Sequence, residues 1–147
     1  MEKIEYRKLN ARQKENYNFQ KVSAVLADYG YITFRLSDDW QGADFIALHI
    51  SGDVLRVQLK SRLAFGTKYQ GKGLHIAFPH EEHWYLYSHD ELLPRVLSVT
   101  NIGTTKSWLE RGGYSFAGLS SELLQELAPY RISGEARGLP GDDMAPN

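Results

Sequence analysis

The stretch from Gly42 to Arg62, GADFIALHISGDVLRVQLKSR, restricts the fold more than any other part of the sequence. An apolar run begins at Asp44, and residues 51–53 (Ser-Gly-Asp) have the composition of a turn. Residues 55–60 then alternate between apolar and polar side chains, which is typical of a strand with one buried face. A β-hairpin is therefore expected, with strands near 44–50 and 54–60. The hairpin brings Asp44 alongside Lys60, and one face of its second strand carries Arg56, Gln58 and Lys60.

The remaining sequence alternates between helical and extended patterns. Apolar residues recur every three or four positions over residues 15–29, which predicts a helix that ends at Gly30. The other expected elements are a strand at 31–36, a turn-rich loop at 37–42, an exposed loop at 64–73, strands at 74–78 and 84–87, and short helices that begin near 88, 107 and 121.

This order of elements predicts an α+β (or α/β) domain in which helices flank one central mixed β-sheet. The length of 147 residues fits a single domain, expected over residues 1–132. Residues 133–147 are rich in glycine, proline and acidic residues, which predicts a disordered tail.

Composition excludes several classes of function. The sequence contains no cysteine, so disulfides, thiolate zinc sites and cysteine nucleophiles are excluded. The formal net charge is −1, so a nucleic-acid surface would have to be a local patch. The N-terminal residues are too charged for a signal peptide, and no apolar run is long enough to span a membrane. A cytoplasmic protein without membrane contact or organic cofactor is expected.

The polar side chains of the hairpin have the chemistry that phosphodiester hydrolysis requires. Mg²⁺ takes oxygen ligands and uses only one or two protein carboxylates, a part that Asp44 can play. The side-chain carbonyl of Gln58 and the backbone carbonyl of Leu59 are further candidate ligands. Lys60 can orient the attacking water or neutralise charge in the transition state. A solvated strand face would also carry these residues, so each one alone is weak support.

The two segments Gly42-Ala43-Asp44-Phe45-Ile46-Ala47 and Val57-Gln58-Leu59-Lys60-Ser61 together resemble the core of the PD-(D/E)XK nuclease superfamily. The resemblance implies a restriction-endonuclease-like core and a metal-dependent DNA endonuclease. It implies Mg²⁺, for which Mn²⁺ can substitute, and a homodimer. By position, Asp44 would be the metal-binding aspartate, Gln58 the second acidic position and Lys60 the catalytic lysine.

The chain departs from the family pattern at two positions. Ala43 stands where the motif has proline, and Gln58 stands where it has an acid, which is similar to the Q-x-K variant of Mrr-like members and of Holliday-junction-resolvase-like members. An amide carbonyl is a weaker ligand than a carboxylate, so another acid would have to compensate, and Glu15 on the first helix is the nearest candidate. The alternative is a catalytically inactive nuclease-fold module that binds nucleic acid or a protein partner.

Two further groups of residues have a functional interpretation beside a structural one. The basic residues of the segment after the hairpin turn fit a DNA backbone, although they also suit an ordinary solvated loop; they are Arg56, Arg62, Lys68 and Lys72. A second group, His80, His83 and His89, raises the alternative of a histidine-metal hydrolase. Its spacing lacks the i, i+4 relation of a zinc-protease helix, which favours surface or loop-end histidines.

Overall fold

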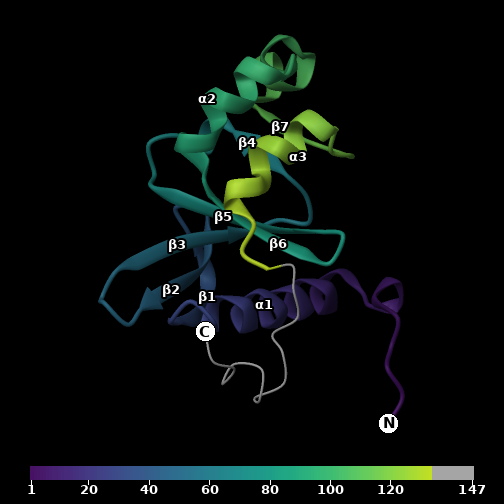
Figure 1. Cartoon of the computed structure of the whole chain (residues 1–147), viewed down its shortest axis with the longest axis vertical. Helices are drawn as coiled ribbons and strands as arrows, with labels where there is room; N and C mark the ends of the chain where they lie inside the picture. The colour runs from purple at the N-terminus through teal and green to yellow at the C-terminus, as the bar shows by residue number, and fades with distance from the viewer. Residues whose placement is uncertain (134–147) are drawn as a thin grey trace, which may run out of the picture.

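A computed structural model describes residues 1–133 and contains a five-stranded mixed β-sheet (Figure 1). The strand order is β1-β2-β3-β5-β6, in which β3 and β5 run parallel and the other neighbours run antiparallel. The five strands are β1 (Tyr31–Trp40), β2 (Ala43–His49), β3 (Val54–Leu59), β5 (Leu74–His80) and β6 (His83–Ser88).

The helix α1 (Ala11–Ala27) covers one face of this sheet. The Asn10 side chain accepts a hydrogen bond from the amide of Gln13, whose own side chain accepts one from the Asn10 amide, so a capping box begins the helix. The buried side chains of α1 pack with alternate residues of the strands, which form a first apolar cluster of Val22, Leu26, Phe45, Ala47, Val57, Ala77 and Trp84.

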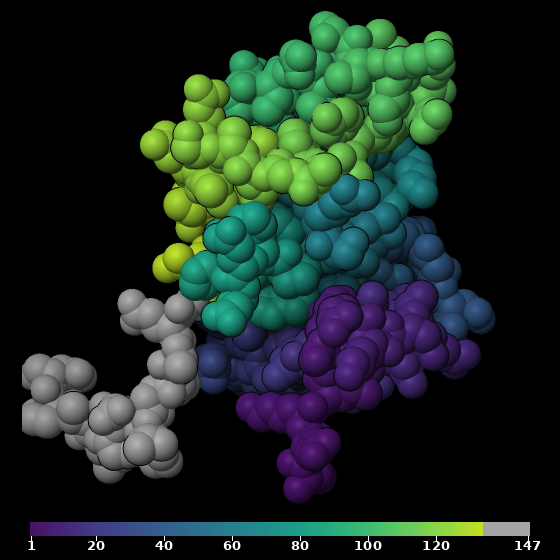
Figure 2. All heavy atoms as spheres, turned by 90° about the vertical axis from the view of Figure 1, so that its right-hand side faces the viewer, coloured from purple at the N-terminus to yellow at the C-terminus, as the bar shows by residue number. Residues whose placement is uncertain are grey.

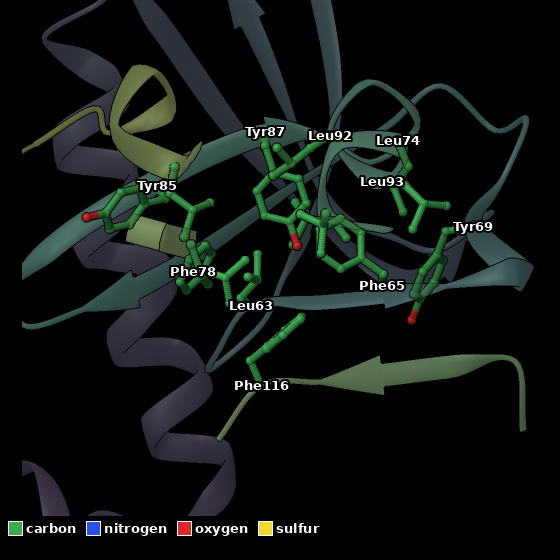
Figure 3. Close-up of a cluster of buried hydrophobic side chains, with 14 of the residues drawn as sticks. Leu63, Phe65, Tyr69, Leu74, Phe78, Tyr85, Tyr87, Leu92, Leu93 and Phe116 are labelled. Atoms are coloured by element: carbon green, nitrogen blue, oxygen red, sulfur yellow. The ribbon is translucent and has the colours of Figure 1, made fainter. Parts of the chain in front are cut away.

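The opposite face of the sheet carries the C-terminal half of the chain, which Figure 2 shows stacked on the strands on the side away from α1. On this side of the sheet lie α2 (His89–Val99), α3 (Ser121–Leu127) and a two-stranded sheet of β4 (Ala64–Gly66) and β7 (Gly113–Ser115). Short 3₁₀-helices lie at Tyr6–Lys8, Thr67–Tyr69, Ile102–Thr104 and Ala128–Tyr130, and a π-helix at Ser107–Arg111. The larger apolar cluster lies here and includes the aromatic residues Phe65, Phe78, Tyr87 and Phe116 (Figure 3).

The side chains of Tyr87 in β6 and His89 at the start of α2 hold β4 in place. One edge of β4 pairs with β7, which leaves the amides of Ala64 and Gly66 directed the other way. The Tyr87 hydroxyl accepts from the Ala64 amide (3.4 Å) and donates to the Ala64 carbonyl (2.6 Å), and His89 Nε2 accepts from the Gly66 amide (3.1 Å). Residues 87 and 89 therefore replace a neighbouring strand, because their two-residue spacing matches that of 64 and 66.

The structure confirms the predicted α+β class, with its helices on both sides of a central mixed sheet. The hairpin lies where the alternation predicted it. The helix predicted at 15–29 is present but begins four residues earlier, and Gly30 follows it with a positive φ of 86°. The helix that begins at Ser121 is also confirmed, with the Ser120 side chain accepting from the Leu123 amide.

Three local predictions were wrong, two of them in part. Residues 37–40 belong to β1, since the turn is the two-residue pair Gln41-Gly42, both with positive φ, as two-residue hairpins favour. Residues 64–73 are only in part an exposed loop: 67–68 and 70–73 are exposed, whereas β4 and Tyr69 are buried. A helix is present where one was expected near 107, but it is a π-helix, and the capping box expected at its start is absent because the Ser107 hydroxyl donates to the Gly113 carbonyl.

The predicted tail at 133–147 falls, from residue 134 on, outside the described residues. Among residues 1–133 no helix combines the length and apolar character needed to cross a membrane.

Removal of the Tyr87 hydroxyl tests the anchor of β4. The Tyr87→Phe change leaves the buried carbonyl and amide of Ala64 without this partner, so the free energy of unfolding should fall by about 1–3 kcal/mol in urea denaturation. The matched control is Tyr29→Phe, which removes an exposed hydroxyl that donates to the Ile132 carbonyl and should change stability by less than about 0.5 kcal/mol. Equal losses in the two variants would contradict the anchoring role.

Candidate active site

Asp44 lies where β2 and β3 separate. The last residue pair of the two strands at this end is Phe45 with Val57, and the same register sets Asp44 opposite Gln58. Beyond that pair the Leu59 amide donates to Asp44 Oδ2 at 2.7 Å, so a carboxylate takes the place of a strand carbonyl. This bond fixes the orientation of the Asp44 side chain.

Gln58 is a buried polar residue, with 8% of its surface exposed. Its neighbour Val57 packs in the α1 cluster, so strand alternation turns Gln58 to the opposite face, where Tyr69 lies. The Gln58 side chain lies beside the Tyr69 hydroxyl and lowers the pKa of the phenol. Gln58 Oε1 is buried and, within residues 1–133, accepts no hydrogen bond. A buried carbonyl oxygen without a donor is a group that a bound cation would satisfy.

Tyr69 covers this part of the sheet. Its ring packs against Gly42 and Gly66, where an added Cβ would lie only 3.3 Å and 3.2 Å from ring atoms. Figure 3 shows Tyr69 at one end of the buried aromatic cluster, with its hydroxyl turned away from the apolar side chains. Burial raises the pKa of the Tyr69 phenol, but the Gln58 amide and the ammonium groups of Lys60 and Lys68 outweigh this effect and bring the pKa below its ordinary value.

Lys60 follows the last residue of β3 and remains within the sheet, since its amide donates to the Ala77 carbonyl at 2.9 Å. Its Nζ lies 5.6 Å from the centre of the Tyr69 ring, and its positive charge lowers the pKa of the Tyr69 phenol. Within residues 1–133 Lys60 forms no ion pair shorter than 4.0 Å. The ammonium group is thus held beside Gln58 without a carboxylate that neutralises it.

The site carries an excess of negative charge around Asp44. Burial raises the pKa of Asp44, the Leu59 amide opposes this, and the carboxylates of Asp39 and Glu15 raise the pKa further against the weaker effect of Lys60. Asp39 Oδ1 accepts from the Gly42 amide at 2.7 Å, and Glu15 lies 4.0 Å from Arg35. Mutual repulsion among these carboxylates is the condition that a cation would relieve.

The described part of the chain contains no group of three or more His, Asp or Glu side chains close enough together to bind a metal ion. Glu15 therefore contributes through its charge and not as part of a preformed cluster. His89 has a structural place under β4, with its Nδ1 3.0 Å from Asp90 Oδ1. His80 and His83 face each other across the β5–β6 hairpin and do not approach His89 as ligands of one site.

The four cations predicted for a DNA surface have different surroundings. Arg56 donates to the Gln41 side chain (2.8 Å) and to the Lys72 carbonyl, and its guanidinium lies 5.4 Å from the Trp40 ring. Arg62 lies at a separate small cleft that Pro79 and His80 also line. Only Lys68 joins Lys60, since its Nζ lies 5.0 Å from the Tyr69 ring.

Asp39 and Tyr69 were not predicted from the sequence as residues of the site. Asp39 stands in a segment predicted as a loop, and its nearness to Asp44 depends on the tight Gln41-Gly42 turn. Tyr69 stands in the segment predicted as exposed. The Gln41-Gly42 dipeptide could have indicated that Asp39 lies near Asp44, because a glycine in a two-residue hairpin turn brings the flanking residues together. Nothing local to the sequence indicated the burial of Tyr69.

Comparisons with known proteins give weak likenesses. No protein-family model matches the chain, and no curated protein matches it. The structure is similar to that of the bacterial homing endonuclease I-Ssp6803I, with a TM-score of 0.49 and 11% identity over 84% of this chain and 87% of the other. It is also similar to Hjc, a Holliday junction resolvase from the archaeal hyperthermophile Archaeoglobus fulgidus, with a TM-score of 0.38 and 12% identity over 50% of this chain and 76% of the other.

The unpartnered oxygen of Gln58 gives a direct test of cation binding. The Gln58→Glu change adds a buried carboxylate opposite Asp44, so it should tighten Mg²⁺ binding by about tenfold or more in isothermal titration calorimetry. Without metal the same variant should unfold more easily, by about 1–3 kcal/mol, because the added charge is buried. Saturating Mg²⁺ should recover that loss.

The control variant is Gln20→Glu, which adds the same charge at an exposed position of α1. It should leave both Mg²⁺ binding and stability unchanged. Unaltered Mg²⁺ affinity in Gln58→Glu would contradict a cation site at this position.

Proposed function

We propose that this protein is a metal-dependent endonuclease that hydrolyses phosphodiester bonds of DNA. The observation that carries the proposal is the buried Gln58 carbonyl oxygen, which accepts no hydrogen bond within residues 1–133 and lies opposite the fixed carboxylate of Asp44, with the ammonium of Lys60 two residues further along the chain. The resemblance of the two hairpin segments to PD-(D/E)XK nucleases supports the same assignment. The placement of the three residues is independent of that resemblance.

The donor set fits a hard cation. Asp44 has a second carboxylate oxygen beyond the one that accepts from Leu59, and Gln58 Oε1 is unused. Both are oxygen ligands of the kind that Mg²⁺ or Mn²⁺ takes, and the backbone carbonyl of Leu59 and the carboxylate of Glu15 are the further candidates. When bound, the ion supplies a water of lowered pKa and positive charge near the scissile phosphate.

Lys60 supplies the second positive charge of the site. A substrate phosphate next to Lys60 would lie against an ammonium that is already held near the Tyr69 ring, so little reorganisation would be needed. Lys60 would orient the attacking water or neutralise the extra charge of the pentavalent transition state. Tyr69 acts through Gln58 and Lys60 and is a positioning residue.

DNA as the substrate and a homodimer as the active form come from the resemblance. Two sites in one dimer would cut two strands. Among the four cations expected to contact the DNA backbone, Lys68 is the one beside the site, while Arg62 and Lys72 are exposed elsewhere. Arg56 is engaged in the hairpin and contributes to folding.

A second candidate is a module that keeps this fold and binds nucleic acid without cleaving it. The observation that favours it is the absence, within residues 1–133, of any group of three acidic or histidine side chains that could hold a metal. An amide at position 58 also gives the site fewer negative ligands than a carboxylate would.

Cleavage assays separate the two candidates. Purified protein should cut supercoiled, linear or branched DNA in Mg²⁺ or Mn²⁺ and lose activity in EDTA. Asp44→Asn and Lys60→Ala should each reduce the rate by about 10²–10³-fold, because each removes one of the fixed charges of the site.

The matched controls are Asp53→Asn, at the exposed tip of the hairpin, and Lys21→Ala, on the outer side of α1 near Tyr17. Both should cut at the rate of the unaltered protein. Cleavage that persists in both the Asp44→Asn and the Lys60→Ala variants would contradict this assignment of the active site. DNA binding with no cleavage in either metal would establish the non-catalytic module.

A further inference from the structure

A second feature lies directly beside the site and has no part in the chemistry described above. It is a cleft of about 360 Å³ that begins at Lys60 and runs between β4, the 3₁₀-turn Thr67–Tyr69 and the π-helix Ser107–Arg111. β7 forms its remaining wall. Because Lys60 belongs both to the cleft and to the candidate active site, whatever occupies one is continuous with the other.

The charge of the cleft has one sign. Its lining includes the cations Lys60, Lys68 and Arg111 and no acidic residue. None of these three side chains forms an ion pair within the described residues, although Lys106 next to the cleft does pair with Glu110. Three unneutralised cations on one concave surface favour a phosphate group.

The rest of the lining is aromatic and glycine-rich. Tyr69 and Tyr114 are among the lining residues, and Tyr114 is held edge-on to Phe116 with ring centres 4.8 Å apart. Gly112 adopts a φ of +69°, and a Cβ there would lie 2.4 Å from the Thr67 hydroxyl, so only glycine lets the two walls meet. Aromatic rings beside cations are the usual platform for an unstacked nucleotide.

The walls of the cleft are fixed before any ligand binds. The Thr67 amide and hydroxyl both donate to the Gly112 carbonyl (2.7 and 3.2 Å), and the Ser107 hydroxyl donates to the Gly113 carbonyl (2.6 Å). His89 holds the floor through the Gly66 amide. These bonds lower the cost of ordering the walls when a ligand binds.

From these features we infer that the cleft holds one nucleotide of the substrate strand, unstacked from its neighbours and next to the scissile phosphate, with its own phosphate at Lys68 and Arg111. This inference rests on the proposed function for the position of the scissile phosphate. A volume of about 360 Å³ lies in the range of small-molecule sites and suits one nucleotide. A preference for DNA with an unpaired, bulged or branched nucleotide follows, because such a base costs less to unstack.

The test measures binding in EDTA, where the proposed chemistry is silent. Fluorescence anisotropy compares duplex DNA with the same duplex carrying one unpaired nucleotide, at salt from about 50 to 200 mM. The unaltered protein should prefer the unpaired substrate. Arg111→Ala and Lys68→Ala should each weaken that binding by about tenfold and lower the salt slope by about one.

The matched control is Lys106→Ala, which removes a cation of the same region that does not line the cleft. It should leave affinity and slope nearly unchanged. In a second measurement, 2-aminopurine is placed at successive positions of the strand, and its emission should rise at one position with the unaltered protein and fail to rise with Arg111→Ala.

Equal effects of Arg111→Ala and Lys106→Ala, or no position of increased emission, would overturn the inference. Metal-dependent cleavage together with that result would leave the proposed nuclease function intact. Conversely, the expected binding and emission without any cleavage would support the cleft and reject catalysis. Binding of a free nucleoside monophosphate alone, with no preference among the DNA substrates, would also overturn it, since it would indicate a small-molecule site.

Discussion

Two side chains that hydrogen-bond to β4, those of Tyr87 and His89, determine where the candidate site lies. The Tyr87 hydroxyl and the His89 imidazole satisfy backbone groups of Ala64 and Gly66 that no strand reaches. Without them a buried edge would stay unpaired, which is costly in free energy. By fixing β4 they also fix Tyr69, and Tyr69 in turn positions Gln58 and Lys60. A packing requirement of the core thus sets the geometry of the candidate site.

The candidate site is built from incomplete pairing. At the start of β2 the Asp44 carboxylate replaces a backbone acceptor for Leu59. Opposite it, the side-chain carbonyl oxygen of Gln58 is buried and accepts no hydrogen bond within residues 1–133. Negative charge from Asp39 and Glu15 adds to that of Asp44. Each of these costs free energy in the metal-free protein. A cation would relieve all of them together, which is why the proposal depends on metal binding and can be tested by stability as well as by cleavage.

The sequence predicted what depends on local periodicity. The hairpin around residues 51–53 and the helix at 121–127 follow from alternation and from a serine cap, and the class of the fold follows from their order. Partners that are distant in the chain were beyond its reach: β4 is extended because β7 pairs with it, and nothing in residues 64–66 indicates residues 113–115. For the same reason Asp44, Gln58 and Lys60 were found together within one hairpin, whereas Tyr69 and Arg111, which come from other segments, were not.

The pairing of β4 with β7 has a consequence for the order of folding events. It joins only three residue pairs across a long intervening segment, so its loop-closure entropy is large and its contact energy small. We expect such a pair to form after the central sheet has condensed and to exchange its amide hydrogens before the sheet does. The cleft wall that carries Arg111 would then be the last part of this surface to assemble. A ligand that bridges Lys68 and Arg111 would slow the local opening of this wall, next to the strands that carry the candidate site.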